Sequence, residues 1–523
     1  MIFRGPYPEV TIPDTALTPF VFGRAGELKD KPALIDGATG RATSYAELDE
    51  WVRRVAAGLA ARGLAKGDVF AILSPNAVEY AIAFHAVALA GGVVTTLNPL
   101  CTAEEIAKQL ADSRAKYLLA APALLDKARE ASARSPLRES FVLGECGDAA
   151  TPFAELAGSG DAAPEVAIDP REDLVALPYS SGTTGASKGV MLTHRNLVAN
   201  LRQIEGTEHA AGGDTLVCVL PMFHIYGLTV IMNFSLYAGA TTVVLPRFDL
   251  EEFLGVVEKH RVTMAHVVPP IMLALAKHPA VARYDLTSLH TVFSAAAPLG
   301  AQTAREVSAR LGCHVKQGYG MTEASPATHM APHDPARGRP GSVGSPVPNT
   351  ECKIVDVETG AELGAGGEGE ICVRGPQVMK GYLNRPEATA ETVDSEGWLH
   401  TGDIGYADPE GHFFIVDRKK ELIKYKGFQV APAELEALLV THAAVADAAV
   451  IPSPDEEAGE VPKAFVVLKP DRAADADELI AFVAARVSPY KKIRLVEFVE
   501  QIPKSPSGKI LRRLLVARER AGR

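Results

Sequence analysis

The chain contains few of the residues that build disulfide scaffolds, zinc sites or membrane spans. Its 523 residues include only six cysteines, and none of them forms a CxxC or other metal-ligand spacing: Cys101, Cys146, Cys218, Cys313, Cys352 and Cys372. Reduced thiols in a cytoplasmic protein are therefore expected. The most apolar stretch, Ala81–Val94, contains His85 and is shorter than the roughly 20 residues that span a bilayer.

Basic residues are fewer than acidic ones, with 53 Lys and Arg against 64 Asp and Glu. The net charge of −11 excludes the basic footprint of a dedicated nucleic-acid-binding protein. The first residues, Met1–Pro6, lack the apolar segment of a secretion signal, and the last, Arg520–Arg523, form no peroxisomal address, so we expect a cytoplasmic location. The apolar content of 47% is typical of a globular protein, and the length predicts two to four domains.

The order of predicted elements indicates an α/β protein. Between about residues 45 and 330, apolar strand-like runs such as Asp68–Leu73 alternate with helix-period segments such as Val78–Ala90 and Leu250–His260. This alternation predicts mostly parallel sheets covered by helices. From about residue 340 to 416, short strands such as Glu351–Val357 and Gly-rich turns predict a small β subdomain.

Five consecutive charged residues, Asp417–Glu421, separate this part from a C-terminal α+β pattern. Such a run is usually a solvated turn, and an interdomain hinge is the more specific interpretation. The following residues predict helix Pro432–Leu439 and strand Ala464–Leu468, which favours a separate domain. The basic end of the chain, from Arg512 to Arg520, is interpreted as a solvated helix terminus.

The segment Tyr179–Gly189 (YSSGTTGASKG) carries the clearest chemical signal. Glycines let the backbone approach a bulky anion, hydroxyls and amides donate to its oxygens, and Lys188 adds a positive charge. The order Ser187-Lys188-Gly189 differs from that of a Walker A loop, in which Ser or Thr follows the lysine. The loop is therefore predicted to bind a polyphosphate by another scheme, and a mobile turn is the plain alternative.

Further motifs follow in a fixed order along the whole length, namely Pro221–Gly227 (PMFHIYG), Gln317–Glu323 (QGYGMTE), Gly369–Gly375 (GEICVRG), Gly397–Asp403 (GWLHTGD), Asp417–Gln429 and Pro503–Lys509 (PKSPSGK). With this set the chain resembles the adenylate-forming superfamily of acyl-CoA synthetases, luciferases and adenylation domains. It is most similar to bacterial 4-coumarate–CoA ligase-like enzymes. The resemblance implies a large N-terminal domain of doubly wound sheets with a small β-barrel subdomain, residues 1–419. It also implies a smaller, mobile α+β C-terminal domain, residues 420–523, with a hinge at Lys420.

The resemblance implies ATP, Mg²⁺ and coenzyme A as cofactors and co-substrates, and it assigns a nucleotide site. The expected nucleotide-binding residues are Ser180, Ser181, Gly182, Thr183, Thr184, Lys188, Gln317, Gly318, Tyr319, Thr322, Asp403, Arg418, Lys424, Gln429 and Lys509. Within this set, Gln317–Tyr319 resembles the adenine segment and Asp403 the ribose-binding carboxylate. Glu323 is expected to hold the magnesium ion, because hard cations prefer oxygen ligands.

The expected catalytic residues are Thr322, Glu323, His224 and Lys509. A carboxylate that attacks the α-phosphorus of ATP approaches a polyanion, and at about 4 Å two like charges repel by roughly 4 kcal/mol at a partly shielded site. Cations and oriented donors must offset this repulsion. By resemblance, Lys509 supplies such a cation, and His224 is the gate between the acid pocket and the thiol tunnel. A regulator that acylates Lys509 is a possible partner, because acylation would remove the charge.

The acid and coenzyme A sites are assigned by resemblance as well. The acid pocket is expected to include Tyr226, Ala296, Gly320, Pro326 and Ala327, and the coenzyme A face Arg247, Lys426 and Gly427. Tyr226 matches a tyrosine that meets a phenol. Plant coumarate ligases have Gly-Gly-Ala-Pro or Gly-Ala-Ala-Pro where this chain has Ala295-Ala296-Ala297-Pro298, and an added methyl would narrow the slot. Ser325 would add bulk and polarity, whereas Ala327 opens space.

The leading hypothesis is therefore an ATP-dependent carboxylate–CoA ligase for a hydroxycinnamate-like acid. A medium- or long-chain fatty acyl-CoA synthetase of the same fold is the alternative among enzymes. A nucleotide-binding pseudoenzyme is disfavoured, because Lys188, Glu323 and Lys509 are all present. A luciferase-type oxygenase shares the first half-reaction, and no motif excludes it.

Overall fold

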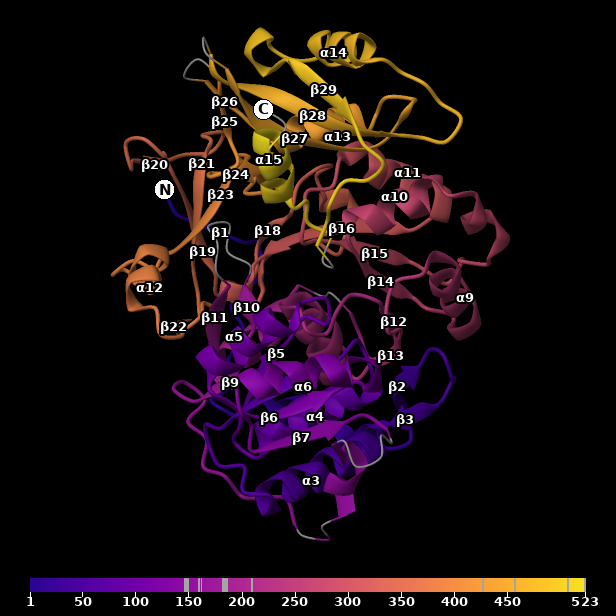
Figure 1. The fold of residues 1–523 in the computed structure, drawn as a ribbon, viewed down its shortest axis with the longest axis vertical. Coiled ribbons are helices and arrows are strands. Elements are labelled where there is room, and N and C mark those ends of the chain that lie inside the picture. Colours follow the sequence, from indigo (N-terminus) through magenta and orange to yellow (C-terminus); the bar gives the residue numbers. More distant parts are fainter. Residues whose placement is uncertain are drawn as a thin grey trace.

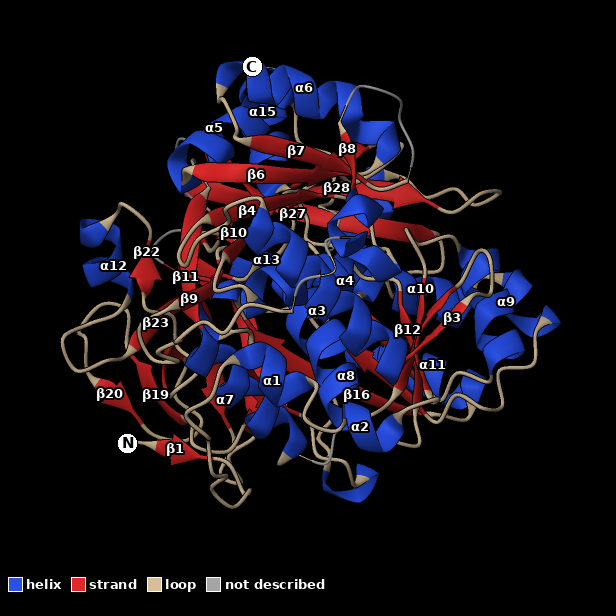
Figure 2. Ribbon diagram, turned by 90° about the horizontal axis from the view of Figure 1, so that it is seen from below, coloured by secondary structure: helices blue, strands red, loops and turns tan. Residues whose placement is uncertain are grey.

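The computed structural model describes residues 1–144, 150–158, 160, 162–180, 187–207, 210–425, 428–455, 458–505 and 508–521. Two large mixed sheets form the greater part of the protein, with helices between and around them (Figures 1 and 2). An antiparallel β subdomain lies on one side, and the C-terminal domain covers the top in Figure 1. The α/β class predicted from the sequence is confirmed.

The first large sheet has nine strands in the order β10-β11-β9-β5-β4-β6-β7-β8, with β22 paired to β11. Its strands are β4 (Val69–Leu73), β5 (Val93–Thr96), β6 (Ala115–Ala120), β7 (Glu139–Val142), β8 (Thr151–Pro152), β9 (Leu174–Ala176), β10 (Tyr179–Ser180), β11 (Lys188–Thr193) and β22 (Gly381–Tyr382). Strands β9 to β8 run parallel, whereas β10, β11 and β22 pair antiparallel at one edge.

The second large sheet also has nine strands, in the order β18-β17-β16-β15-β14-β12-β13-β2-β3. Its strands are β2 (Pro32–Asp36), β3 (Ala42–Ser44), β12 (Thr215–Cys218), β13 (Thr241–Val244), β14 (Met264–Val267), β15 (Thr291–Ser294), β16 (His314–Gly320), β17 (Ala327–Met330) and β18 (Ser345–Pro346). The six central strands are parallel, so their carboxyl ends lie along one edge, where ligand sites of open α/β sheets are found.

Helices cover both sheets; most of them share one large hydrophobic core with the sheets, whereas α5 and α6 pack in a separate, smaller cluster. They are α1 (Leu17–Val21), α2 (Ala25–Leu28), α3 (Tyr45–Ala61), α4 (Val78–Leu89), α5 (Ala103–Ser113), α6 (Leu125–Arg134), α7 (His194–Glu205), α8 (Phe234–Ala238), α9 (Leu250–His260), α10 (Pro269–Lys277) and α11 (Ala301–Leu311). Thr102 and Glu105 form the capping box of α5, as their spacing predicts. No helix of the described residues is both long and apolar enough to cross a membrane.

One predicted helix differs in its geometry. The pattern at 228–238 predicts an ordinary α-helix, but the structure has a π-helix over Tyr226–Asn233 that continues into α8. Every residue of this wide turn is buried. π-Helical turns are rare and frequently occur at functional sites, and this one begins at Tyr226 of the predicted acid pocket.

The β subdomain is a six-stranded antiparallel sheet in the order β1-β19-β21-β23-β24, with β20 paired to β19. Its strands are β1 (Phe3–Arg4), β19 (Glu351–Val355), β20 (Glu362–Leu363), β21 (Gly369–Arg374), β23 (Leu399–Ala407) and β24 (Phe413–Arg418), and α12 (Pro386–Thr392) lies beside them.

The C-terminal domain has its own sheet and its own core. Its strands are β25 (Ile423–Tyr425), β26 (Phe428–Val430), β27 (Val445–Asp455), β28 (Gly459–Leu468) and β29 (Leu495–Phe498), and its helices are α13 (Pro432–Leu439), α14 (Ala476–Ala484) and α15 (Arg512–Ala521). The chain leaves the β-subdomain sheet after Arg418 and enters this five-stranded sheet at Ile423. The two sheets are thus joined by only a few residues.

Candidate active site

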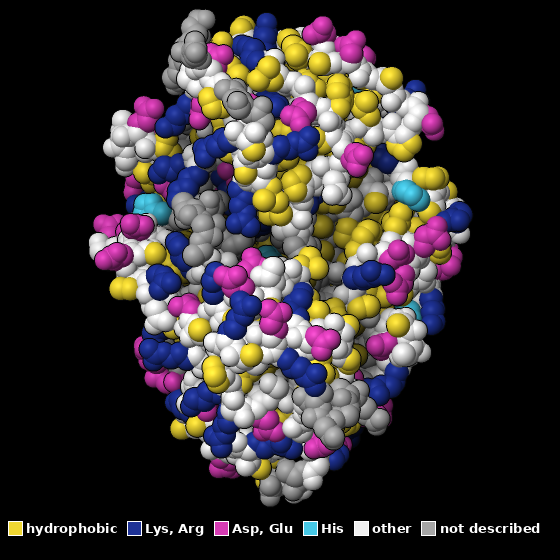
Figure 3. Space-filling model, in the orientation of Figure 1, with side chains coloured by type: hydrophobic (Ala, Val, Ile, Leu, Met, Phe, Trp, Pro, Cys, Tyr) yellow, Lys and Arg dark blue, Asp and Glu magenta, His cyan; other side chains and the backbone are white. Residues whose placement is uncertain are grey.

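A cleft of about 690 Å³ lies where the large domain meets the C-terminal domain. Figure 3 shows the surface hollowed in this region. Residues of the large domain that line the cleft include Pro269, Ala296, Ala297, Gly318, Tyr319, Gly320, Asp403 and Arg418, and those of the C-terminal domain include Lys504, Gly508, Lys509 and Arg512. The wall of the large domain follows the carboxyl ends of β14, β15 and β16, where a parallel sheet leaves room for a ligand.

Three of the predicted nucleotide residues interact directly in this cleft. The hydroxyl of Tyr319 donates to Oδ2 of Asp403 over 2.5 Å, and Nε of Arg418 lies 3.4 Å from Oδ1 of the same carboxylate. Asp403 and Arg418 are opposite each other on the antiparallel strands β23 and β24. Burial raises the pKa of Asp403, while Arg418 and Tyr319 act against this rise. The pair provides a fixed acceptor next to a fixed cation.

Lys509 enters the same cleft from the C-terminal domain on a tight turn. The backbone N–H of Lys509 donates to Oγ of Ser505 over 3.1 Å, and the N–H of Ser505 donates to the carbonyl of Lys509 over 2.8 Å. Gly508, with φ of 78°, allows the turn to approach Val268, whose Cγ2 would lie 3.1 Å from an added Cβ. The sequence motif thus places a lysine against the large domain.

The electrostatic surroundings of Lys509 agree with this position. Burial and the neighbouring Arg418 lower the pKa of Lys509, whereas Asp403 and Glu323 raise it in part. Burial, with a smaller contribution from Lys509, lowers the pKa of His224 to about 3, so this imidazole is neutral near pH 7. A cation, two carboxylates and a neutral imidazole from distant parts of the sequence therefore share one site.

The predicted phosphate loop is closed at its base by the hairpin β10–β11. Ser180 pairs with Lys188 in this hairpin, and the ammonium of Lys188 lies 4.6 Å from the ring centroid of Tyr382. The Tyr382 hydroxyl donates in turn to Oε1 of Glu323 over 2.8 Å. Glu323 is 8% exposed and belongs to the 3₁₀ turn Thr322–Ala324. The base of the loop and the Thr322–Glu323 pair are thus connected through Tyr382, which the sequence analysis did not single out.

The predicted acid pocket begins behind the wall of the cleft. Tyr226 is 5% exposed, and its hydroxyl lies 3.2 Å from Nδ1 of the fully buried His266. Phe293 completes an aromatic cluster, with ring centroids 6.5 Å from Tyr226 and 5.4 Å from His266. Gly318 separates this cluster from the cleft, because an added Cβ would lie 2.5 Å from Cζ of Phe293. His266 was missed from sequence, since one histidine in an apolar strand gives no distinguishing signal.

The other predicted residues of the acid pocket, Ala296, Gly320, Pro326 and Ala327, lie at the ends of β15 to β17. Ala296 lies in the cleft wall with φ of 72°, a left-handed conformation that is uncommon for a residue other than glycine. Gly320 approaches Pro326 so closely that an added Cβ would lie 2.1 Å from its carbonyl oxygen. Ala327 follows Pro326 as the first residue of β17 and is buried.

Comparisons with known proteins agree with these features. The family model described as AMP-binding enzyme matches residues 22–383, and the one described as AMP-binding enzyme C-terminal domain matches residues 434–509. The chain belongs to the AMP-binding enzymes. Within this family it is an AMP-forming acid–CoA ligase that is similar over its full length to 4-coumarate–CoA ligases.

Two plant relatives illustrate the similarity. The ligase is 48% identical to 4-coumarate–CoA ligase 5 of Oryza sativa subsp. japonica, with 100% of this chain and 98% of the relative covered. It is 45% identical to 4-coumarate–CoA ligase 1 of Petroselinum crispum, with 100% and 97% covered.

Two solved structures share the architecture. The anthranilate CoA ligase AuaEII in complex with anthranoyl-AMP gives a TM-score of 0.91 at 26% identity, with 98% of each chain covered. ATP-bound MatB of Rhodopseudomonas palustris gives 0.86 at 33% identity, with 96% of this chain and 98% of that chain covered.

Some predicted site residues lie outside this assembly or outside the described residues. Lys424 on β25 and Arg247 after β13 are exposed, and the described residues that line the cleft do not include them. Gln429 pairs with Lys424 across the β25–β26 hairpin. The predicted residues that fall outside the described part of the ligase are Ser181, Gly182, Thr183, Thr184, Lys426 and Gly427.

The polar group of Ser325 is held within the fold. Its side chain is fully buried, and the hydroxyl donates to the carbonyl of Gln377 over 2.8 Å. The proton of this hydroxyl is therefore used within the protein fold, and the residue does not add a free donor to the acid pocket.

The solvated-turn and solvated-terminus interpretations are wrong for two residues of the ligase. Asp417 is 5% exposed, and its Oδ2 accepts from the backbone N–H of Ala433 over 2.8 Å. Arg512 donates to both oxygens of Glu436 over 2.8 Å and lies 3.0 Å from Glu421. Burial raises the pKa of Glu436 to about 7, against the opposing effect of Arg512. These charged residues line the cleft, and tertiary packing has removed much of their contact with water.

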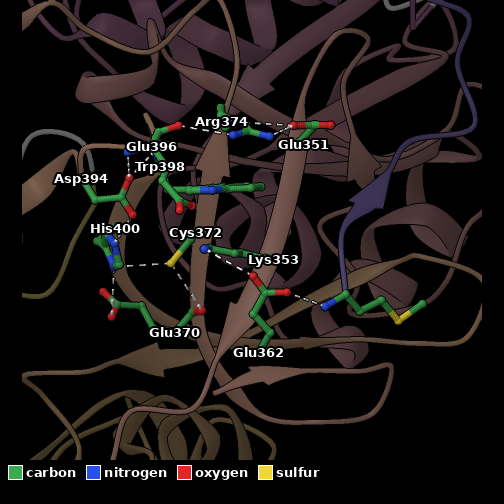
Figure 4. Close-up of polar contacts among 11 residues, drawn as sticks. Glu351, Lys353, Glu362, Glu370, Cys372, Arg374, Asp394, Glu396, Trp398 and His400 are labelled. Carbon is green, nitrogen blue, oxygen red and sulfur yellow. Dashed lines mark hydrogen bonds and ion pairs between the residues drawn. The ribbon is translucent and has the colours of Figure 1, made fainter. Parts of the chain in front are cut away.

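The β subdomain contains a Cys–His–Asp arrangement that resembles a nucleophilic triad (Figure 4). Sγ of Cys372 lies 3.5 Å from Nδ1 of His400, and Nε2 of His400 lies 3.2 Å from Oδ2 of Asp394. Burial raises the pKa of Cys372 to about 12, so its thiol stays protonated and is a poor nucleophile. Glu370 beside it accepts from the N–H of Gly402 over 3.0 Å, and this contact fixes the strand that carries Asp403.

Proposed function

We propose that this ligase converts a hydroxycinnamate-like aromatic acid into its coenzyme A thioester in two steps. In the first, the acid's carboxylate attacks the α-phosphorus of ATP, pyrophosphate leaves, and an acyl adenylate forms. In the second, the thiol of coenzyme A loses its proton and attacks the acyl carbon, and AMP leaves. The observation that carries the proposal is that Lys509 lines one cleft with Asp403 and Arg418, with Glu323 near enough to act on its charge.

The nucleotide would occupy the cleft between the two domains. Asp403 would accept from the ribose hydroxyls, since a buried carboxylate beside Arg418 has an acceptor oriented in advance. Gln317, Gly318 and Tyr319 would contact the adenine, with the glycine allowing close approach. The rest of the proposed phosphate contacts are Ser180, Ser181, Gly182, Thr183, Thr184, Lys188 and Thr322, with Lys424 and Gln429 on the C-terminal domain.

Charge stabilisation explains the proposed roles of Lys509 and Glu323. Lys509 would bridge the α-phosphate and the attacking carboxylate, where negative charge accumulates as the bond forms. Glu323 offers a buried carboxylate whose Oε1 is held by Tyr382, and its other oxygen would hold Mg²⁺, which supplies charge neutralisation to the phosphates. Acylation of Lys509 by a regulator stays a prediction.

The second step would require the C-terminal domain, residues 420–523, to rotate relative to residues 1–419 about Lys420. Lys419, next to this hinge, is anchored to the β subdomain, because its Nζ lies 3.0 Å from Oε2 of Glu370. Rotation would withdraw Lys509 and bring Lys426 and Gly427 to the cleft, with Arg247 contacting coenzyme A phosphates. His224 would control passage of the thiol to the acid.

The identity of the acid is supported by the relatives' printed activity and by the pocket. Tyr226, Ala296, Gly320, Pro326 and Ala327 would surround an aryl-propenoate, and the aromatic cluster behind Gly318 suits a ring. The test is substrate-dependent pyrophosphate release with cinnamate, 4-coumarate, caffeate and a series of fatty acids from hexanoate to palmitate. Higher kcat/KM for the hydroxycinnamates supports the proposal, and higher kcat/KM for fatty acids would replace it with a fatty acyl-CoA synthetase.

A further inference from the structure

The base of the proposed acid pocket contains a buried polar pair that no motif of the sequence indicated. The hydroxyl of Tyr226 lies 3.2 Å from Nδ1 of His266, and both side chains are buried, at 5% and 0% exposure. His266 is on β14, opposite Phe293 of β15, which in turn is opposite the buried Lys316 of β16. Paired residues of parallel strands point to the same face of a sheet, so these side chains form one row under Tyr226.

The protonation states of the pair follow from their surroundings. Burial and the nearby Lys316 lower the pKa of His266 to about 3, and burial raises the pKa of Tyr226 well above its usual range. Near neutral pH the pair is therefore a neutral imidazole and a neutral phenol. A neutral imidazole has one N–H donor and one nitrogen lone pair, and a phenol is the better donor of the two groups.

We propose that His266 is a positioning residue that accepts the hydroxyl proton of Tyr226 at Nδ1, and so leaves the Tyr226 oxygen to accept from a donor on the acid's ring. This inference rests on the proposed function, and it specifies the substrate class further. The pocket would select acids with a ring O–H or N–H at this depth over acids of equal size without a donor. Nε2 of His266 carries the imidazole proton in this arrangement.

The direction of the hydrogen bond decides the selectivity. If Nδ1 carried the proton instead, it would donate to Tyr226, whose hydroxyl would then donate to the substrate and favour ring acceptors. The two arrangements make opposite predictions for a ring amino group, which donates, and a ring fluorine, which accepts, whereas a ring hydroxyl can serve in either. An unpaired donor or acceptor in a buried site carries a desolvation cost, so about a tenfold difference in kcat/KM is expected for one hydrogen bond.

The experiment compares cinnamates that carry 4-hydroxy, 4-amino, 4-methyl or 4-fluoro groups, using pyrophosphate release by the full-length ligase with ATP and Mg²⁺. We expect kcat/KM for the 4-hydroxy and 4-amino acids to exceed that for the 4-methyl and 4-fluoro acids by about tenfold, mainly through KM. The preference should disappear in His266→Leu and return in His266→Asn, because the asparagine amide oxygen can accept in place of Nδ1.

His85 provides a matched control for the loss of a buried histidine. It is fully buried, burial lowers its pKa to about 3, and its Nδ1 lies 3.2 Å from Oγ1 of Thr18, far along the chain from the cleft residues. His85→Leu should lower the thermal stability of the ligase and leave the ratio of kcat/KM between donor and methyl acids unchanged.

The outcomes separate this inference from the proposed function. Equal use of all four acids by the wild-type ligase, a preference for the 4-fluoro acid, or an unchanged preference in His266→Leu would overturn the role of His266. Failure of every cinnamate, together with activity on fatty acids, would instead refute the proposed function.

Discussion

Replacement of Lys509 by glutamine should separate the two half-reactions. Lys509 lines a cleft with Asp403 and Arg418, and Glu323 is near enough to act on its charge; glutamine keeps a polar side chain there while removing the charge. Loss of one transition-state donor in a water-poor site costs about 3 to 4 kcal/mol, and each 1.36 kcal/mol is a factor of ten in rate. Adenylate formation is therefore expected to fall about a hundredfold to a thousandfold.

The same variant should retain most of the second step, since Lys509 is proposed to leave the cleft before the thiol enters. The first assay is pyrophosphate release from ATP with a hydroxycinnamate. The second supplies the chemically prepared acyl adenylate with coenzyme A and measures the thioester. Equal losses in both assays would contradict the rotation of the domain, and an unchanged rate of pyrophosphate release would contradict the role of Lys509.

Lys504 offers a control from the same turn. Its backbone forms an isolated antiparallel β-bridge with Ile510, and its Nζ lies 2.6 Å from Oδ2 of Asp447. A partly exposed ion pair contributes about 0 to 1 kcal/mol, so Lys504→Gln should change stability little. Its adenylation rate should stay close to that of the wild type, and a loss as large as that of Lys509→Gln would indicate damage to the turn rather than to the chemistry.

Three further perturbations test other parts of the site. Tyr382→Phe removes the 2.8 Å hydrogen bond to Glu323. The KM for MgATP should rise, because a hydrogen bond to a charged group contributes about 1.5 to 3 kcal/mol. An unchanged dependence of the rate on the MgATP concentration would count against a role for the Tyr382–Glu323 contact. Glu436 has a pKa near 7 in the folded state, above its ordinary value of 4.5, so the folded protein binds more protons and stability should fall as pH rises from about 4.5 to about 7. Glu436→Gln should remove this component from the pH dependence of the unfolding temperature, and an identical slope in both proteins would show that another group is responsible. Ala296→Gly relieves a left-handed φ of 72° and removes a methyl group from the wall of the cleft. The kcat/KM for ring-methoxylated acids should therefore rise relative to that for 4-coumarate, while the free energy of unfolding changes by no more than about 1 kcal/mol.

Local patterns were sufficient for the helices with a clear apolar period. Helices α9 and α13 have the bounds that the sequence pattern predicts, and the spacing of Thr102 and Glu105 indicates the capping box of α5. These features depend on neighbours three or four residues apart, which the sequence displays directly. The π-helical turn at Tyr226 was missed, because its wide geometry is imposed by packing in the core rather than by a local pattern.

The candidate site divides in the same way. The order of motifs in the sequence is sufficient to identify the family and to indicate Asp403, Arg418, Glu323 and Lys509 as candidate site residues. It did not indicate Tyr382, which links Lys188 to Glu323, nor His266 of β14, which lies within hydrogen-bond distance of Tyr226 on the π-helix. The Tyr226–His266 and Tyr382–Glu323 contacts join residues that are 40 and 59 positions apart in the sequence. No local sequence pattern predicts contacts over such separations.

The amino-acid sequence alone determined the α/β class, the family and the chemical types of the active groups. Each of these can be recognised from short segments, because backbone geometry and phosphate chemistry restrict which residue types can occur in them. Folding decided which charges lost their water. The sequence suggests that Asp417 and Arg512 are surface residues, yet Asp417 is buried and Arg512 is held by Glu436 and Glu421 beside the cleft. Desolvation depends on everything packed around a group, and so it exists only in the assembled structure.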